Sequence, residues 1–291
     1  MNLQLSAKRR ESIIGLAFIL PAMIGIGVLF VVPFIESIYI SLTSSISASG
    51  QTGISNYLDM LQNRTFRLAF INTFRFILVS VPLIMAFSLT IAMLLHKKLK
   101  GSQFFSSVFI FPLILPIVTV IMFFEIIFDT GGFINLSLMR LGLPIVDWLN
   151  SSASFTVLVI IYIWKNCGYN IVLFLAALNS IPSEINEAYS LDSKSVFRRI
   201  YSLTLPLISP YLFFILCLSI INTFRSFREA YILAGSHPHT SIYMVQHFIS
   251  NNIRNMNYPR LAVATIIVFL AMIIPIFFAF RYRVKKQAGE L

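Results

Sequence analysis

The sequence predicts an all-α membrane protein with six transmembrane helices, and three observations support this fold class. Hydrophobic residues make up 57% of the 291 residues, charged residues make up 11%, and the mean hydropathy is +0.84. A soluble domain of this size is far less apolar. Five charge-free runs, and a sixth interrupted only by Lys165, reach the ~20 residues that a helix needs to cross the hydrocarbon core.

These runs lie at residues 12–35, 76–95, 101–124, about 153–178, 200–224 and 261–280. Six spans place both termini on the same side of the membrane. The first run is longer than the apolar core of a signal peptide and no clear cleavage site follows it, so we interpret it as a retained helix.

The distribution of Lys and Arg predicts that both termini are cytoplasmic. With that orientation the inner segments hold thirteen basic residues and the outer segments hold five. The inner set is Lys8, Arg9, Arg10, Lys97, Lys98, Lys100, Lys194, Arg198, Arg199, Arg281, Arg283, Lys285 and Lys286; the outer set is Arg64, Arg67, Arg140, Arg254 and Arg260. The net charge of +11 therefore fits a membrane surface with its lipids, and we expect no nucleic-acid partner.

We expect three parts along the chain. Residues 1–11 form a cytoplasmic N-terminus, residues 12–282 form the six-helix domain, and residues 283–291 form a cytoplasmic tail. The domain includes outer loops at about 36–66, 129–152 and 235–260 and a long cytoplasmic loop at 181–206. Cys167 and Cys217 both fall inside spans, which argues against a disulfide framework, and their spacing does not suggest a metal site.

The cytoplasmic loop has an unusual order of charges for a segment between two spans. Glu184, Glu187 and Asp192 precede Lys194, Arg198 and Arg199, an order that suits the dipoles of short helices. Val196, Ile200 and Leu203 share one face of the second predicted helix at i, i+4 and i+7. Such a helix suits either a groove in a partner protein or the lipid surface.

The loop resembles the EAA loop of binding-protein-dependent ABC importers. That pattern runs E-A-A-x-x-D-G, then an apolar residue thirteen positions after the Glu, then I-x-L-P, and it matches here without a gap. The matching residues are Glu187, Ala188, Asp192, Ile200, Leu203, Leu205 and Pro206. The chain departs from the pattern at Tyr189 (usually Ala), Ser193 (usually Gly) and Lys194 (usually small); Ser adopts the left-handed backbone that Gly permits only at some cost.

Other segments are similar to the carbohydrate-type permeases of this family. Among these, the chain resembles the larger maltose-type permease rather than the smaller one. They are Leu20-Pro21-Ala22, Pro33 ahead of Ser41-Leu42-Thr43, Trp164-Lys165-x-x-Gly168-Tyr169-Asn170, Leu175-Ala176-x-Leu178, Ile181-Pro182-x-Glu184 and Tyr243-Met244-x-Gln246. The resemblance covers nearly the whole chain. It implies the type I ABC importer permease fold and a location in the plasma membrane of a prokaryote.

The resemblance also implies a set of partners. A cytoplasmic ABC ATPase dimer would bind the loop through Glu187, Ala188, Asp192, Ser193, Ile200, Leu203 and Pro206. A second permease would complete a heterodimer, and an extracytoplasmic solute-binding protein would deliver a sugar. The chain has no G-x-x-x-x-G-K-[ST] motif, so we expect no cofactor of its own and assign ATP and Mg²⁺ to the ATPase.

Ionisable residues inside spans mark a solute path or an ion pair. Lys165, Tyr169 and Asn170 offer a charge, a stacking surface and hydrogen bonds to a sugar; alternatively, Lys165 pairs with a neighbouring helix, for instance through Glu125. In the fifth span, Arg225 and Glu229 have the i, i+4 spacing of an ion pair. Asn222 and Arg225 complete our candidates for the solute path.

His237, His239 and His247 lie in the third outer loop. His-x-His spacing can bind a metal, but no acidic or Cys residue is near, so we interpret the three as parts of a surface loop.

The sequence therefore predicts a non-catalytic permease subunit of an ATP-driven importer for a sugar or oligosaccharide. Glycerol phosphate or another small polar solute is the alternative within this class. An ATP-independent channel or secondary transporter would favour internal repeats or broken helices, and we find no convincing repeat between the halves. A membrane enzyme would need clustered acids, His or Cys, whereas the 11 acidic residues are scattered.

Overall fold

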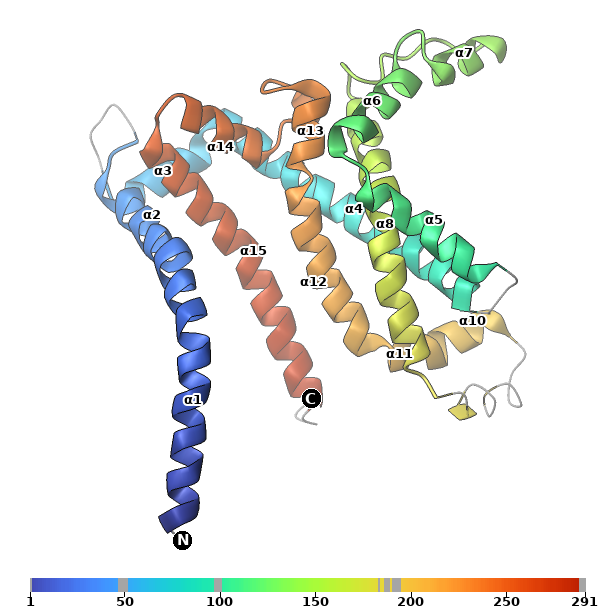
Figure 1. The fold of residues 1–291 in the computed structure, drawn as a ribbon. Helices are drawn as coiled ribbons and strands as arrows, with labels where there is room; N and C mark the ends of the chain where they lie inside the picture. Colours follow the sequence, from blue (N-terminus) through green and yellow to red (C-terminus); the bar gives the residue numbers. More distant parts are fainter. Residues whose placement is uncertain are drawn as a thin grey trace. The chain divides into compact units, whose positions relative to one another are not determined.

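The computed structural model describes residues 2–46, 52–96, 101–182, 184–185, 189 and 195–287, and the secondary-structure elements of this part are all helices (Figure 1). Six segments of this described part are long and apolar enough to cross a membrane, which is the number that the sequence predicts. They are Ser12–Thr43, Arg64–His96, Ile117–Arg140, Ser154–Asn179, Ser209–Ala234 and Tyr258–Arg281. The third of them extends into the predicted outer loop at 129–152, and the first half of the predicted span at 101–124 is a shorter apolar helix. The chain forms two compact units, one of residues 1–66 with 251–291 and the other of residues 67–250.

The first unit contains α1 (Asn2–Ile26), a π-helical turn (Gly27–Val31), α2 (Val32–Thr43), α3 (Ile54–Gln62) and α15 (Tyr258–Gln287). Helices α2 and α15 pack side by side, and the ring centroids of Phe34 and Phe269 are 4.9 Å apart. Asn56 of α3 is buried and donates to the carbonyls of Ser41 and Ser44 at 2.9 Å each. These bonds use carbonyls that the end of α2 leaves unpaired.

The second unit contains most of α4 (Arg64–His96) and most of α14 (Val245–Arg254), together with the elements between them. These are α5 (Ser102–Ile114), α6 (Ile117–Phe128), α7 (Phe133–Arg140), α8 (Ser154–Asn179), α10 (Val196–Arg199), a π-helical turn (Ile200–Thr204), α11 (Leu205–Leu207), α12 (Ser209–Arg225), α13 (Phe227–Ala234) and a 3₁₀ turn (Thr240–Ile242). Helix α8 forms the centre of this unit, because α5, α6, α12 and α13 all pack against it.

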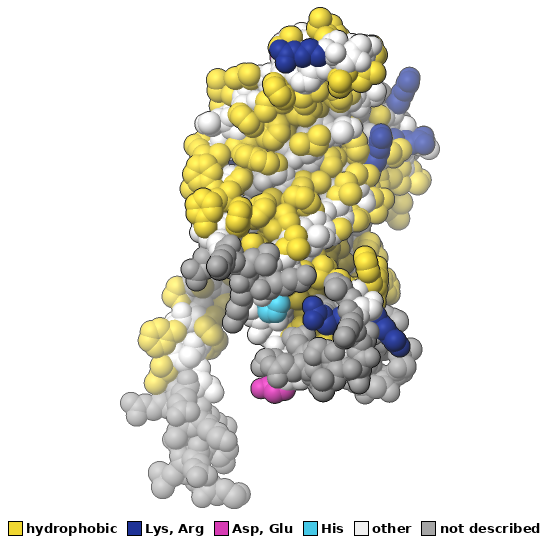
Figure 2. All heavy atoms as spheres, turned by 90° about the vertical axis from the view of Figure 1, so that its right-hand side faces the viewer, with side chains coloured by type: hydrophobic (Ala, Val, Ile, Leu, Met, Phe, Trp, Pro, Cys, Tyr) yellow, Lys and Arg dark blue, Asp and Glu magenta, His cyan; other side chains and the backbone are white. Residues whose placement is uncertain are grey.

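Apolar side chains cover much of the middle of the face drawn in Figure 2, and Lys and Arg side chains lie toward its two ends. This distribution suits a surface whose middle contacts lipid hydrocarbon. The core of the second unit is formed by side chains from α4, α8 and α12, among them Phe76, Ile84, Tyr162, Phe174 and Ile215.

Helices α5 and α8 approach each other closely at Gly168. A Cβ atom placed on Gly168 would lie 2.0 Å from the carbonyl oxygen of Phe109 and 3.0 Å from the Cα of Ile110. Only glycine permits this contact, and small residues at close helix crossings are typical of membrane proteins. The close packing of α5 against α8 therefore explains why a glycine occupies position 168 of the resemblance motif.

Two predicted spans differ from the structure, and proline accounts for both differences. The run at 101–124 divides into α5 and α6, because Leu115 before Pro116 is extended, with ψ of 140°. The run at 200–224 begins as short helical turns and becomes a long helix only at Ser209, after Pro206 and before Pro210. Apolar composition alone does not reveal such breaks.

Each described π-helical turn ends two residues before a proline. The Val32 N–H bonds to the Gly27 carbonyl ahead of Pro33, and the Leu205 N–H bonds to the Ile200 carbonyl ahead of Pro206. A proline ring clashes with the carbonyl four residues earlier in an α-helix. We attribute the wider turns to this clash.

Candidate solute path and coupling loop

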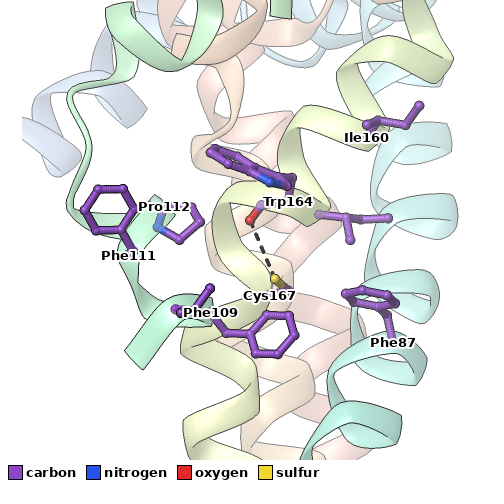
Figure 3. A pocket seen from close by; sticks show the side chains of 9 residues that line it. Phe87, Phe109, Phe111, Pro112, Ile160, Trp164 and Cys167 are labelled. Carbon is purple, nitrogen blue, oxygen red and sulfur yellow. Dashed lines mark hydrogen bonds between the residues drawn. The ribbon is translucent and has the colours of Figure 1, made fainter. Parts of the chain in front are cut away.

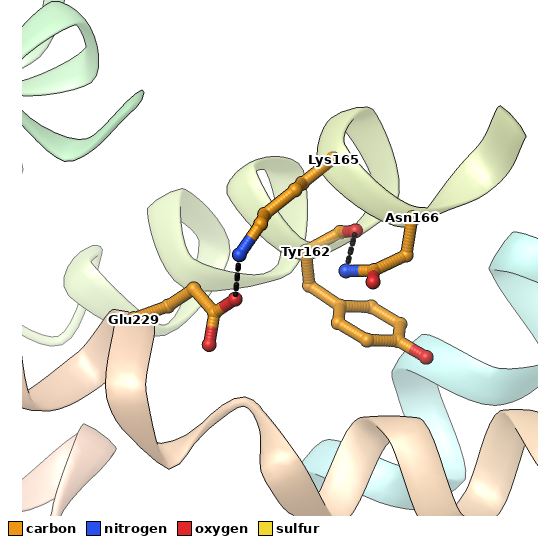
Figure 4. Close-up of polar contacts among 4 residues, drawn as sticks. All are labelled: Tyr162, Lys165, Asn166 and Glu229. Atoms are coloured by element: carbon orange, nitrogen blue, oxygen red, sulfur yellow. Dashed lines mark hydrogen bonds and ion pairs between the residues drawn. The ribbon is translucent and has the colours of Figure 1, made fainter. Parts of the chain in front are cut away.

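An ion pair joins α8 to α13 inside the second unit. The Lys165 ammonium lies 2.8 Å from Oε1 of Glu229, and the two side chains are 15% and 6% exposed (Figure 4). Lys165 thus pairs with a neighbouring helix, but its partner is Glu229 and not Glu125. The predicted pair between Arg225 and Glu229 does not form among the described residues.

A hydrogen-bonded cluster next to this pair joins α8 to α12. The hydroxyl of Thr223 lies 2.7 Å from the hydroxyl of Tyr162 and 2.6 Å from the carbonyl oxygen of Ser219. The amide of Asn170 donates to the Ser219 hydroxyl at 3.0 Å, and Asn170 is only 2% exposed. In this conformation Asn170 therefore attaches α8 to α12 and does not face an open path.

The fifth span is interrupted at Ser226, a buried residue with φ of −68° and ψ of 3°. Arg225 ends α12, and Glu229 lies in the first turn of α13. A cation at a helix C-terminus and an anion at a helix N-terminus both suit the helix dipoles. The charges at the break are therefore placed where they stabilise the ends of the two helices.

The segment between α13 and α15 forms hydrogen bonds with α4 and with the end of α12, next to the break at Ser226. Asn72 donates to the carbonyls of Thr240 and Tyr243 at 2.6 Å and 3.0 Å. Gln246 donates to the Phe224 carbonyl at 2.6 Å, near the end of α12, where carbonyls lose their intrahelical partners. The resemblance motif that contains Gln246 is the sequence signal that could have identified this contact.

His247 is buried in the same segment, so it is not part of an exposed loop. Its ring stacks on Tyr243 with centroids 5.5 Å apart, and its Nδ1 accepts from the Met244 N–H at 3.1 Å. Burial, with a smaller contribution from His237, lowers the pKa of His247 from 6.5 to about 4. His247 is therefore neutral at physiological pH.

Three of the predicted path residues remain accessible. Asn222 and Tyr169 are half-buried, Arg225 is exposed, and none of the three side chains has a hydrogen bond or ion pair with the described residues. Asn222 and Arg225 lie one turn apart on α12, while Tyr169 lies on α8. These groups can donate and accept hydrogen bonds, which is the chemistry that a polar solute needs.

A separate pocket between α4, α5 and α8 has a different character (Figure 3). Its volume is about 420 Å³, and it is lined by Phe87, Val108, Phe109, Phe111, Pro112, Ile160, Ile163, Trp164 and Cys167. The Cys167 thiol donates to the Trp164 carbonyl, within the same helix. Because the lining is almost entirely apolar, this pocket does not suit a sugar.

The predicted coupling loop is described in part. Glu187, Ala188, Asp192 and Ser193 lie outside the described residues. Ile200 and Leu203, which share a predicted face, are half-buried, and Pro206 is exposed. The side chain of Val196, the third residue of that predicted face, is not among those described.

The other side of α10 and of the π-helical turn that follows it, away from Ile200 and Leu203, is strongly exposed. Phe197 and Tyr201, four residues apart, are 76% and 72% exposed. The hydroxyl of Tyr189 lies 2.5 Å from that of Ser202, so this departure from the family pattern links the first half of the loop to the second.

These features define a multi-pass α-helical membrane protein with a polar, charged break in one span. Residues 79–287 match the model of the family described as "binding-protein-dependent transport system inner membrane component". The chain belongs to this family.

Known proteins resemble the chain over most of its length. It is 32% identical to the trehalose/maltose transport system permease MalF of Thermococcus litoralis, over 81% of this chain and 82% of that protein. It is 30% identical to the probable ABC transporter permease YesP of Bacillus subtilis, over 91% and 88%. The fold is that of a chain in a bacterial ABC transporter involved in the import of the acidic polysaccharide alginate, with a TM-score of 0.78, 20% identity, and 97% and 98% of the two chains covered.

Proposed function

We propose that this chain is the non-catalytic permease subunit of an ATP-driven importer and forms half of the translocation path for a sugar or oligosaccharide. Membership of the binding-protein-dependent family is the observation that carries this proposal. The trehalose/maltose permease among its relatives supports a carbohydrate solute. In this assembly a second permease supplies the other half of the path, and a solute-binding protein delivers the sugar.

The loop at 181–206 couples this subunit to a cytoplasmic ATPase dimer, which binds ATP and Mg²⁺. Glu187, Ala188, Asp192 and Ser193 enter a cleft of the ATPase. Ile200 and Leu203, with the buried Thr204 beside them, attach the end of the loop to the rest of the second unit. Movement of the ATPase is then transmitted to the spans as a rigid-body rotation.

The solute passes beside the polar break of the fifth span. Asn222, Arg225 and Tyr169 contact it, because their polar groups are accessible and unpaired among the described residues. Lys165 and Asn170 act from behind this surface: their bonds to Glu229 and Ser219 hold α8 against α12 and α13. A positioned framework of this kind reduces the entropy lost when a solute binds.

The test is purification of the chain from native membranes in mild detergent, followed by mass spectrometry. We expect a second permease and an ATPase, with the ATPase lost after Glu187→Lys combined with Asp192→Lys. Asp59→Lys, a charge reversal on α3, is the matched control and should retain the ATPase. An ATPase that stays bound to the double variant would contradict the coupling role of the loop.

An ATP-independent channel or secondary transporter is the competing function. The interruption at Ser226 favours it, because broken helices inside a span are typical of secondary transporters. Family membership favours the ATP-driven importer. A chain that purifies alone and transports in liposomes without ATP would establish the alternative.

A further inference from the structure

Two arginines on the surface of the second unit are not neutralised by any described residue. Arg225 ends α12 and Arg228 lies in the first turn of α13, on either side of the break at Ser226. Both side chains are exposed, and neither forms an ion pair or hydrogen bond with the described part of the chain. The break therefore presents two positive charges on an open face.

Both arginines lie inside a candidate membrane span. This span is Ser209–Ala234, and its midpoint falls between residues 221 and 222. At a rise of 1.5 Å per residue, Arg225 lies roughly 5 Å along α12 from that midpoint, and Arg228 follows the break at Ser226. Arginine facing lipid at this depth is unfavourable, so this face borders protein or a water-filled path.

The described acids of the second unit form no ion pair with these arginines. Glu229 follows Arg225 by four residues, but its carboxylate bonds to Lys165. Glu125 lies on α6, which packs against α13, and it makes no ion pair with either arginine. The pairing of Lys165 with Glu229 leaves Arg225 available to another anion.

We propose that Arg225 binds an anionic group of the transported solute, either the carboxylate of an acidic sugar or the phosphate of a phosphorylated one. A guanidinium is planar and can donate two parallel hydrogen bonds to either oxyanion. Arg228 adds positive potential, and the half-buried amide of Asn222, one turn earlier, suits a sugar hydroxyl. This inference rests on the proposed importer function and names the class of solute.

The experiment uses the whole importer in proteoliposomes, with ATP inside and the binding protein outside. The probes are two pairs that differ in charge: digalacturonate with its methyl ester, and glycerol 3-phosphate with glycerol. We expect uptake of one charged probe to exceed that of its neutral counterpart. The pair that shows this preference distinguishes a carboxylate from a phosphate.

Arg225→Gln should lower uptake of the preferred charged probe roughly ten- to a hundredfold, the usual effect of losing hydrogen bonds between charged groups, and so reduce the preference for that probe over its neutral counterpart. Arg225→Lys keeps the charge and should lose less. Arg140→Gln removes an exposed arginine at the end of α7 and should have no effect.

Three results would overturn the inference. The wild-type importer could carry only neutral sugars, in which case the importer function stands and the anionic class fails. Arg225→Gln could release the second permease, which would mean that Arg225 pairs with that subunit. Absence of ATP-dependent uptake of every solute tested would refute the importer function and this inference with it.

Discussion

The contact of Gly168 with α5 makes a quantitative prediction about stability. Replacement by alanine would place a Cβ atom 2.0 Å from the carbonyl oxygen and 2.6 Å from the carbonyl carbon of Phe109. Non-bonded carbon atoms prefer separations of about 3.5–4.0 Å, so the helices must separate by roughly 1 Å or more. The atoms in the way belong to the backbone, and no side-chain rotation can relieve the clash.

Overpacking of this kind costs about 1–3 kcal/mol, and we expect at least that here. For a chain of this size each kcal/mol lowers Tm by roughly 2–4 °C. The assay heats the detergent-purified protein with a thiol-reactive dye, which reports unfolding through the buried Cys167.

Gly25→Ala is the matched control. No heavy atom lies within 4 Å of a Cβ at Gly25, so this variant should melt at or slightly above the wild-type temperature. A Gly168→Ala protein with the wild-type Tm would refute the close approach of α5 and α8.

Three further predictions concern the polar groups. Lys165→Met or Glu229→Met alone should destabilise the protein by about 3–5 kcal/mol because a buried charge loses its partner, whereas the two substitutions combined should be much milder. A double-mutant cycle of Tm values checks this, and additive losses would contradict it. Tyr162→Phe should cost about 0.5–1.5 kcal/mol through the lost bond to Thr223, measured in the same assay against Thr223→Val. His247 has a pKa of about 4 in the folded protein and about 6.5 in the unfolded protein, so the unfolded state binds more protons between pH 4 and pH 6.5. The folded state therefore keeps its full stability with respect to His247 above pH 6.5. This stability falls by up to about 3 kcal/mol as the pH drops to 4. His247→Gln should remove this slope from a plot of Tm against pH, and an unchanged slope would assign it to other groups.

The membrane class and the six spans could be predicted from hydropathy, because the length of an apolar run is the property that a bilayer selects. The positions of the helix ends are harder to predict from hydropathy. Pro116 divides one predicted span, and a break at Ile208, two residues before Pro210, delays another; both effects depend on backbone geometry at single residues. Proline next to a long apolar run is therefore a local signal that deserves as much weight as the run itself.

The contacts among the candidate residues could not be predicted from the sequence. Arg225 and Glu229 have the spacing of a helical ion pair, yet the helix is interrupted between them and Lys165 of another helix binds the carboxylate. Partners 64 residues apart in the sequence leave no periodic signal. Asn170 similarly looked like a solute contact, and only the fold reveals the Ser219 hydroxyl beside it.

The central claim, that this subunit transports only when a partner hydrolyses ATP, is tested most directly by uptake into proteoliposomes that contain the whole importer. The account predicts uptake when ATP is inside and the binding protein outside, and none when ATP is replaced by a non-hydrolysable analogue. Uptake with the analogue at the same rate as with ATP, or uptake by this chain without its partners, would contradict the central claim.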